Sequence, residues 1–137
     1  ARTAPVDVVV IQGNHDYERM FYSGEFLRAF FLNDERITID NNYDSRKYYS
    51  YGVNLIMYTH GDKEKPAEMP LIMATEQPML FAKAKFREVH CGHLHKEMVN
   101  EYRGVKTTQN RVTGQLYIRP VLITFRFDQI GIIPVNL

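Results

Sequence analysis

The sequence lacks the features of a secreted or membrane-spanning chain. Its one cysteine, Cys91, cannot form an internal disulfide, which excludes a scaffold held together by such bonds. Unbroken apolar runs, of which residues 8–11 are an example, are far shorter than a bilayer span. No basic stretch followed by an apolar one marks a secretory signal. We therefore expect a cytoplasmic location and no membrane partner.

A marked excess of charge of either sign is also lacking. The chain has 17 basic and 16 acidic side chains and a net charge of +1, so charge alone indicates neither nucleic acid nor an anionic membrane as a partner. Hydrophobic residues make up 45% of the 137 residues, which is enough for a folded core and excludes a disordered tail. The length predicts a single domain over residues 1–137.

The first predicted element is a buried strand close to the start of the chain. Val6–Ile11 is a β-branched run bounded by Pro5 and Gly13, and both of its faces carry apolar groups. Such a strand needs neighbours in a sheet and cover on both sides. Because a domain rarely begins with its most buried strand, we expect an N-terminally truncated domain, with sequence missing before residue 1. The alternative is a natural first strand after loss of the initiator Met.

Hydrophobic spacing and turn residues predict the remaining elements. Apolar residues recur at helical spacing over residues 17–32, although Gly24 weakens this helix. A second helical segment over residues 71–86 is expected to be kinked or split by Pro78, and residues 63–70 are expected to form a charged linker. The predicted strands are residues 37–39, 47–51, 53–58, 86–91, 98–102, 105–108, 121–127 and 130–135. The class is therefore α/β with a strand-rich C-terminal half.

Histidines follow several of these strands. His15, His60, His93 and His95 lie in glycine-containing loops after predicted strands, and ligand sites collect at such strand ends in α/β sheets. Neutral imidazole is a common ligand of transition metals, and the side-chain oxygen of Asn14 suits a hard or borderline cation. In an extended backbone, the rings of His93 and His95 point to one face. The pattern predicts a metal site built from three separate segments.

Three motifs resemble a known family. Residues 13–16 (Gly-Asn-His-Asp), 59–62 (Thr-His-Gly-Asp) and 92–95 (Gly-His-Leu-His) resemble the last three motifs of the calcineurin-like metallophosphoesterases, in the expected order. The resemblance covers the chain from about residue 6 to residue 95. It implies an α/β fold in which a sandwich of two β-sheets is flanked by helices, with two metal ions at the strand ends.

The resemblance also implies a role for each motif residue. Asn14, His60 and His93 would ligate one metal ion, and His95 would ligate the other. The cofactor is then a pair of divalent ions in the full-length parent, with Mn²⁺ first and Fe, Zn²⁺ or Mg²⁺ as alternatives. Two such cations neutralise phosphoryl oxygens and activate a water as the nucleophile.

Two further residues would act without binding metal. His15 would face the substrate as general acid or electrostatic stabiliser, which is typically worth about 10²–10⁴ in rate. Asp16 would hold His15 in the right tautomer by accepting its other N–H. The implied activity is a metal-dependent phosphoesterase acting on phosphodiesters or phosphomonoesters, with nucleases and nucleotide phosphodiesterases among the family members. Nucleotides and nucleic acids are therefore candidate substrates.

Part of the family pattern is absent from this sequence. The Asp-x-His motif and the metal-bridging Asp precede the Gly-Asn-His-Asp motif in the family, and no Asp-x-His occurs in this chain. We expect both to lie before residue 1, and we expect the chain as given to bind metal weakly and to hydrolyse phosphoesters poorly or not at all. A truncated sheet also leaves an exposed edge, which predicts self-association through that edge.

Other residues and functions have simpler interpretations. His90 is expected to have a core or supporting role rather than to bind metal, and Cys91 is expected to be a buried thiol. The tyrosines at 43, 48, 49, 51 and 58 favour hairpin packing, with a base-stacking platform as the alternative. A non-catalytic phosphoesterase-like scaffold or subunit is the alternative function. A structural zinc site is disfavoured because it expects several cysteines.

Overall fold

The computed structural model describes residues 5–93, 96–109, 115–118 and 123–125. The chain forms two compact units, one from residues 1–44 with 114–137 and the other from residues 45–113. Each unit has its own β-sheet, so the predicted α/β class with two sheets and helices is confirmed. The single domain over residues 1–137 and the sandwich of the two sheets stay predictions.

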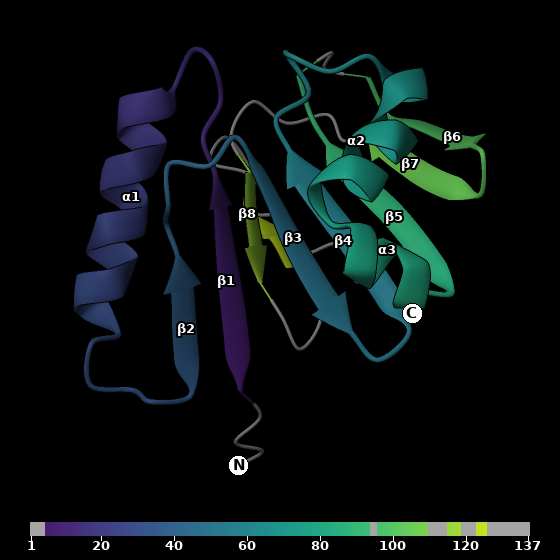
Figure 1. Cartoon of the computed structure of the whole chain (residues 1–137). Helices are drawn as coiled ribbons and strands as arrows, with labels where there is room; N and C mark the ends of the chain where they lie inside the picture. Colours follow the sequence, from purple (N-terminus) through teal and green to yellow (C-terminus); the bar gives the residue numbers. More distant parts are fainter. Residues whose placement is uncertain (1–4, 94–95, 110–114, 119–122, 126–137) are drawn as a thin grey trace. The chain divides into compact units, whose positions relative to one another are not determined.

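The first unit is a four-stranded sheet with one helix against it (Figure 1). Its strand order is β2-β1-β8-β9, with β2 parallel to β1 and β8 antiparallel to it. Val8, Val10 and Met20 form a buried cluster in this unit, so helix α1 packs on the β1 face that carries the two valines. The elements are β1 (Val6–Ile11), α1 (Tyr17–Phe30), β2 (Ile37–Asp40), β8 (Gln115–Ile118) and β9 (Ile123–Phe125).

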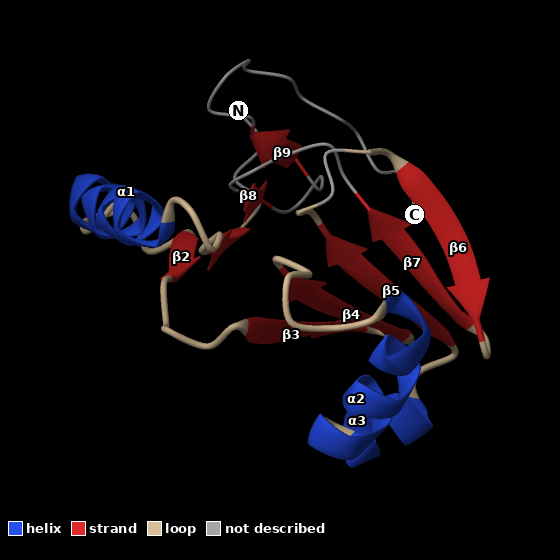
Figure 2. Cartoon of the chain, turned by 90° about the horizontal axis from the view of Figure 1, so that it is seen from above, coloured by secondary structure: helices blue, strands red, loops and turns tan. Residues whose placement is uncertain are grey.

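The second unit is a five-stranded sheet with two short helices on one face (Figure 2). Its order is β3-β4-β5-β7-β6, in which β4, β5 and β7 run parallel and the outer strands β3 and β6 are antiparallel to their neighbours. Leu55, Met57 and Val89 of the sheet pack with Met69 and Met73 of helix α2 (Met69–Glu76). The elements are β3 (Arg46–Tyr51), β4 (Asn54–Thr59), η1 (Pro66–Glu68), α2 (Met69–Glu76), α3 (Pro78–Lys83), β5 (Phe86–Cys91), β6 (Met98–Tyr102) and β7 (Val105–Gln109).

Prolines account for the one clear difference in the helical region. Residues 63–70, predicted as a linker, contain η1 and the start of α2. Pro66 and Pro70 occupy first-turn positions of these helices, where the missing N–H needs no partner and the fixed φ suits the helix. Pro78 separates α2 from α3 as predicted. Pro66 and Pro70, which were predicted to lie in a linker, therefore lie in the first turns of two helices.

In the C-terminal part, the strands of the structure agree only partly with the strands predicted from the sequence. Strand β9 falls inside the predicted strand 121–127, whereas β8 (Gln115–Ile118) was not predicted. The predicted strand over residues 130–135 lies outside the described residues. None of the described helices is both long and apolar enough to cross a bilayer.

Candidate functional site

Two of the predicted motifs begin at the same edge of one sheet. Strands β4 and β5 are parallel neighbours, with Tyr58 paired to His90. Strand β4 ends at Thr59 and β5 ends at Cys91. Because the carboxyl ends of parallel strands meet at one edge of a sheet, the loops that carry His60 and His93 start side by side.

The imidazoles of His60 and His93 approach each other at this edge. The Nδ1 atom of His93 lies 3.3 Å from Nε2 of His60, and the two rings are inclined at 77°. His60 is buried, at 6% exposure, and His93 is half-buried. Two nitrogens on one metal with bonds of about 2.1 Å lie about 3.0–3.4 Å apart in octahedral or tetrahedral geometry. The observed spacing fits a pair of ligands to one ion.

The backbone around His93 is held in an uncommon conformation. His93 has φ +76°, a left-handed value that is uncommon for residues other than glycine and that collects at functional sites. The N–H of Gly92 donates to the carbonyl of His60 at 2.9 Å, which links the two loops directly. The backbone at His93 is therefore not extended, so the condition under which His93 and His95 point to one face is not met.

Glycine is required where the His60 loop turns. Gly61 has φ +92°, and a Cβ placed there would lie 3.1 Å from the Cβ of Cys91. A side chain at this position would be strained and would press on β5. The His-Gly pair of the motif thus has a local physical reason: the glycine lets the chain turn away immediately after His60.

The Gly-Asn-His-Asp motif forms a closed loop in the first unit. It lies between β1 and α1, and Asn14 and His15 are exposed. The carboxylate of Asp16 accepts the backbone N–H of Gly13 at 2.9 Å, so Asp16 fixes the shape of the loop. Its predicted role in orienting His15 stays a prediction.

A hollow of about 490 Å³ lies beside this loop. His15, Tyr17 and Arg19 are among its lining residues. The ring of Tyr17 stacks on Tyr43 at 6.0 Å between centroids, and Tyr43 in turn stacks on Phe21 at 4.8 Å. Tyr43 therefore packs with α1, not with the hairpin where it was expected. The hollow combines an imidazole, a guanidinium and a supported aromatic ring with the carboxylates of Asp16 and Glu18.

The predicted metal-binding residues are only partly brought together by the structure. His60 and His93 meet in the second unit, whereas Asn14 belongs to the first unit, and His95 lies outside the described residues. Among the residues that the structure describes, no group of three or more His, Cys, Asp or Glu side chains is placed to hold a metal ion. The two imidazoles fit a metal as one pair of ligands and need further ligands to complete a site.

His90 and Cys91 have the supporting roles that the sequence favours. His90 is buried, and its Nε2 lies 3.1 Å from Oε2 of Glu88. The hydrogen bond with His90 lowers the pKa of Glu88, and the nearby Lys106 adds to the effect. Burial raises the pKa of the Cys91 thiol to about 11, with a further contribution from Glu64. A protonated, buried thiol is a poor nucleophile.

A buried carboxylate beside the His60 loop was not predicted. Glu64 falls in the segment expected to be a linker, yet it is 8% exposed and pairs with Arg46 at 2.8 Å. The signal that points to this pair is the register of the hairpin, which places Arg46 opposite Thr59, the residue before His60. A boundary of the hairpin at residue 47 leaves Arg46 outside it and hides the pairing.

The chain was compared with protein-family models, curated protein sequences and solved structures. No protein-family model and no curated protein sequence matches the chain. Among solved structures, the chain is similar to a conserved uncharacterized protein, described as a predicted phosphoesterase, from Streptococcus pneumoniae TIGR4. The identity is 13%, the match covers 98% of this chain and 95% of that chain, and the TM-score is 0.41. So distant a similarity does not bear on the activity of this chain.

Proposed function

We propose that this chain is part of a metal-dependent phosphoesterase in which His60 and His93 bind the metal. The observation that carries the proposal is the 3.3 Å approach of Nδ1 of His93 to Nε2 of His60. It occurs where two parallel strands end at a shared edge. The distance is that of a hydrogen bond between the two rings, and two imidazole ligands of one ion lie about as far apart.

The further ligands of the proposed site come from the sequence motifs. Asn14 is proposed to join His60 and His93 on one ion, and His95 is proposed to bind a second. Mn²⁺ is the first candidate for this mixture of nitrogen and oxygen ligands, with Fe, Zn²⁺ or Mg²⁺ as alternatives. When bound, such ions supply positive charge against phosphoryl oxygens and make water a stronger nucleophile.

His15 is the residue proposed to act on the substrate directly. It is exposed beside the hollow, on a loop closed by the bond from Gly13 to Asp16. In this position His15 donates a proton to the departing oxygen of the phosphoester, and the closed loop limits the directions from which it can do so.

The hollow favours a nucleotide or nucleic acid among phosphoester substrates. Arg19 carries the fork of donors that binds phosphate oxygens, and Tyr17 offers a ring already stacked on Tyr43. Aromatic rings of this kind stack on nucleobases without regard to sequence. An alkyl phosphoester would leave the ring unused. A cytoplasmic location is proposed for this activity.

The alternative function is a non-catalytic phosphoesterase-like scaffold or subunit. Such a module needs the two sheets and their cores but has no use for the convergence of His60 and His93 or for the left-handed backbone at His93. The pair of imidazoles therefore favours the enzyme.

The test measures Mn²⁺ binding by calorimetry and hydrolysis of phosphodiesters in the same samples. We expect wild type to bind Mn²⁺, and His60→Ala or His93→Ala to weaken binding by about 100-fold or more, since each loses a ligand. His90→Asn is the matched control, because His90 lies on β5 and bonds to Glu88 instead. Slow Mn²⁺-dependent turnover of bis-p-nitrophenyl phosphate should fall by about 10²–10⁴ in His15→Ala.

The outcomes separate the two functions. Mn²⁺ binding that is unchanged in both His60→Ala and His93→Ala would contradict the proposed site. Mn²⁺ binding that depends on both histidines, together with measurable phosphoester hydrolysis that His15→Ala leaves unchanged, would support the scaffold. Faster turnover of nucleotide esters than of alkyl esters would support the proposed substrate class.

A further inference from the structure

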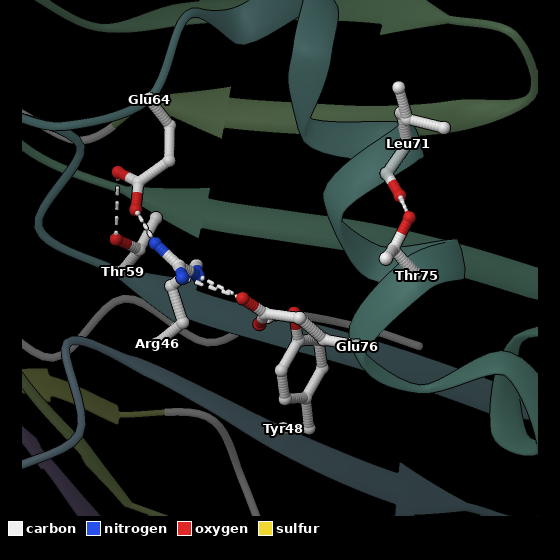
Figure 3. Close-up of polar contacts among 7 residues, drawn as sticks. All are labelled: Arg46, Tyr48, Thr59, Glu64, Leu71, Thr75 and Glu76. Atoms are coloured by element: carbon white, nitrogen blue, oxygen red, sulfur yellow. Dashed lines mark hydrogen bonds and ion pairs between the residues drawn. The ribbon is translucent and has the colours of Figure 1, made fainter.

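The loop that carries His60 is anchored at both of its ends by one buried carboxylate. Glu64 follows His60 by four residues, and its side chain is 2% exposed. One oxygen of this carboxylate accepts the hydroxyl of Thr59, the residue before His60, at 3.2 Å. The other accepts Nη1 of Arg46 at 2.8 Å. Figure 3 shows dashed lines from the Glu64 carboxylate to both of these partners.

Arg46 connects this carboxylate to the helix on the same face of the sheet. Its Nε donates to Oε1 of Glu76 at 2.9 Å, and Tyr48 donates its hydroxyl to Oε2 of Glu76 (Figure 3). The two carboxylates raise the pKa of Arg46, so its charge is permanent. The guanidinium thus links β3, the loop after β4 and the end of α2 through its bonds to Glu64 and Glu76.

The loop is also fixed on its far side by β5. The carbonyl of His60 accepts the N–H of Gly92 at 2.9 Å. Residues 59 to 64 are therefore held at Thr59, at the carbonyl of His60 and at Glu64. A buried charge such as Glu64 is costly unless it is paired, so the pairing with Arg46 keeps this carboxylate, and the loop with it, in one position.

We propose that Arg46 and Glu64 are positioning residues that hold His60 in register with His93. They act through the backbone of the loop, with Thr59 as the link between Glu64 and His60. The consequence for metal binding rests on the proposed function. The consequence for the geometry of the loop does not, because it concerns the chain alone.

The first test follows the geometry by amide hydrogen exchange measured with NMR. The amide of Gly92 reports the bond to His60, and the amide of Val89, in the core of β5, reports global opening. We expect Glu64→Gln to speed exchange at Gly92 by about tenfold or more and to leave Val89 unchanged, because a charge-assisted bond is lost locally. Thr59→Val, which keeps the pair of Arg46 and Glu64, should give a smaller increase and serves if Glu64→Gln does not fold.

Tyr48→Phe is the matched control, because it removes a bond to Glu76 and leaves Glu64 untouched. Exchange at Gly92 should stay at the wild-type rate in this variant. An unchanged rate at Gly92 in both Glu64→Gln and Thr59→Val would overturn the proposal. An increase matched at Val89 would overturn it as well, since that pattern is global destabilisation.

The second test measures Mn²⁺ affinity by electron paramagnetic resonance in the same variants. Glu64→Gln should weaken binding by about tenfold, in the range known for residues that orient metal ligands, whereas Tyr48→Phe should not. Wild-type affinity in Glu64→Gln would overturn the positioning role while leaving the proposed function intact. Failure of the wild type to bind Mn²⁺ would overturn the proposed function, and the exchange rates would still decide the role of Glu64.

Discussion

Arg46 shows how much one side chain can organise at the surface of a sheet. Its guanidinium contacts Glu64, which is buried, and Glu76, whose side chain is 33% exposed. The hydrogen bond from Arg46 lowers the pKa of Glu76. Burial raises the pKa of Tyr48, and its bond to Glu76 adds to the rise. The two acidic partners therefore differ in role, because Glu64 holds a loop whereas Glu76 ties a helix end to β3.

The pKa of Glu76 leads to a prediction about the pH dependence of stability. A carboxyl whose pKa is lower in the folded state stabilises the fold above its ordinary value of 4.5 and loses this effect as pH falls through the folded value. Glu76→Gln should therefore lower the free energy of unfolding by about 1 kcal/mol at neutral pH, a figure suited to a partly exposed pair. At a pH well below 4.5 the two proteins should unfold alike in urea, followed by circular dichroism.

Glu68→Gln provides the control for this experiment. Glu68 forms an exposed pair with Lys65 at 3.9 Å, so its removal should cost almost nothing at either pH. A loss of stability in Glu76→Gln that persists undiminished at acid pH would show that the carboxylate charge is not its cause.

The approach of His60 to His93 was easier to predict than the burial of Glu64. His60 and His93 stand beside glycines after apolar strands, so residue type and spacing both mark them. Glu64 carries no such mark, because its burial depends on the register of β3 against β4 and on the start of α2. Those are tertiary facts, and a charged run looks the same whether it is solvated or buried.

At the scale of elements, a glycine of helix α1, Gly24, allows the helix to pack closely against the residue that follows β2. Asn41, directly after β2, is 2% exposed, and its amide donates to the carbonyl of Phe21 at 3.0 Å and to Glu25 at 2.9 Å. A Cβ on Gly24 would lie 2.2 Å from Oδ1 of Asn41. The glycine that weakens the helix in the sequence is the residue that admits this amide.

Gly24→Ala should therefore destabilise the protein, although alanine favours a helix by about 1 kcal/mol. We expect a net loss of about 1–3 kcal/mol in urea unfolding, because the new methyl group displaces a buried, hydrogen-bonded amide. Ser23→Ala, one position earlier in the helix, should change stability much less. In an Asn41→Ala background the same Gly24→Ala change should cost little or stabilise, so a strictly additive pair of effects would contradict the clash.

Elements with strong local signals were predicted within one or two residues. The helix over residues 17–32 is α1 (Tyr17–Phe30), and the hairpin around Gly104 is β6 and β7. Strand β8 was missed because Gln115–Ile118 is only four residues long and gains its place from pairing with β1. Short strands of this kind depend on a partner far away in the sequence, which local patterns do not contain.

At the scale of the whole chain, each of the two sheets has outer strands. In the second unit these are β3 and β6, and β6 carries the exposed apolar side chains of Met98 and Val99, at 43% and 59% exposure. Outer strands present backbone N–H and C=O groups to other chains, and natural sheets protect them with charge or short length. Strand β6 has five residues and one acidic side chain, Glu101, which is modest protection.

We predict that the protein self-associates through β6 at high concentration. Val99→Lys should weaken the association by about tenfold or more, since a lysine on an outer strand opposes pairing with a second strand. Val53→Lys is the control, because Val53 is also exposed, at 41%, but lies in the turn between β3 and β4. Sedimentation velocity over a range of concentrations measures both. A wild type that stays monomeric throughout, or an equal effect of the two lysines, would show that β6 is not the contact.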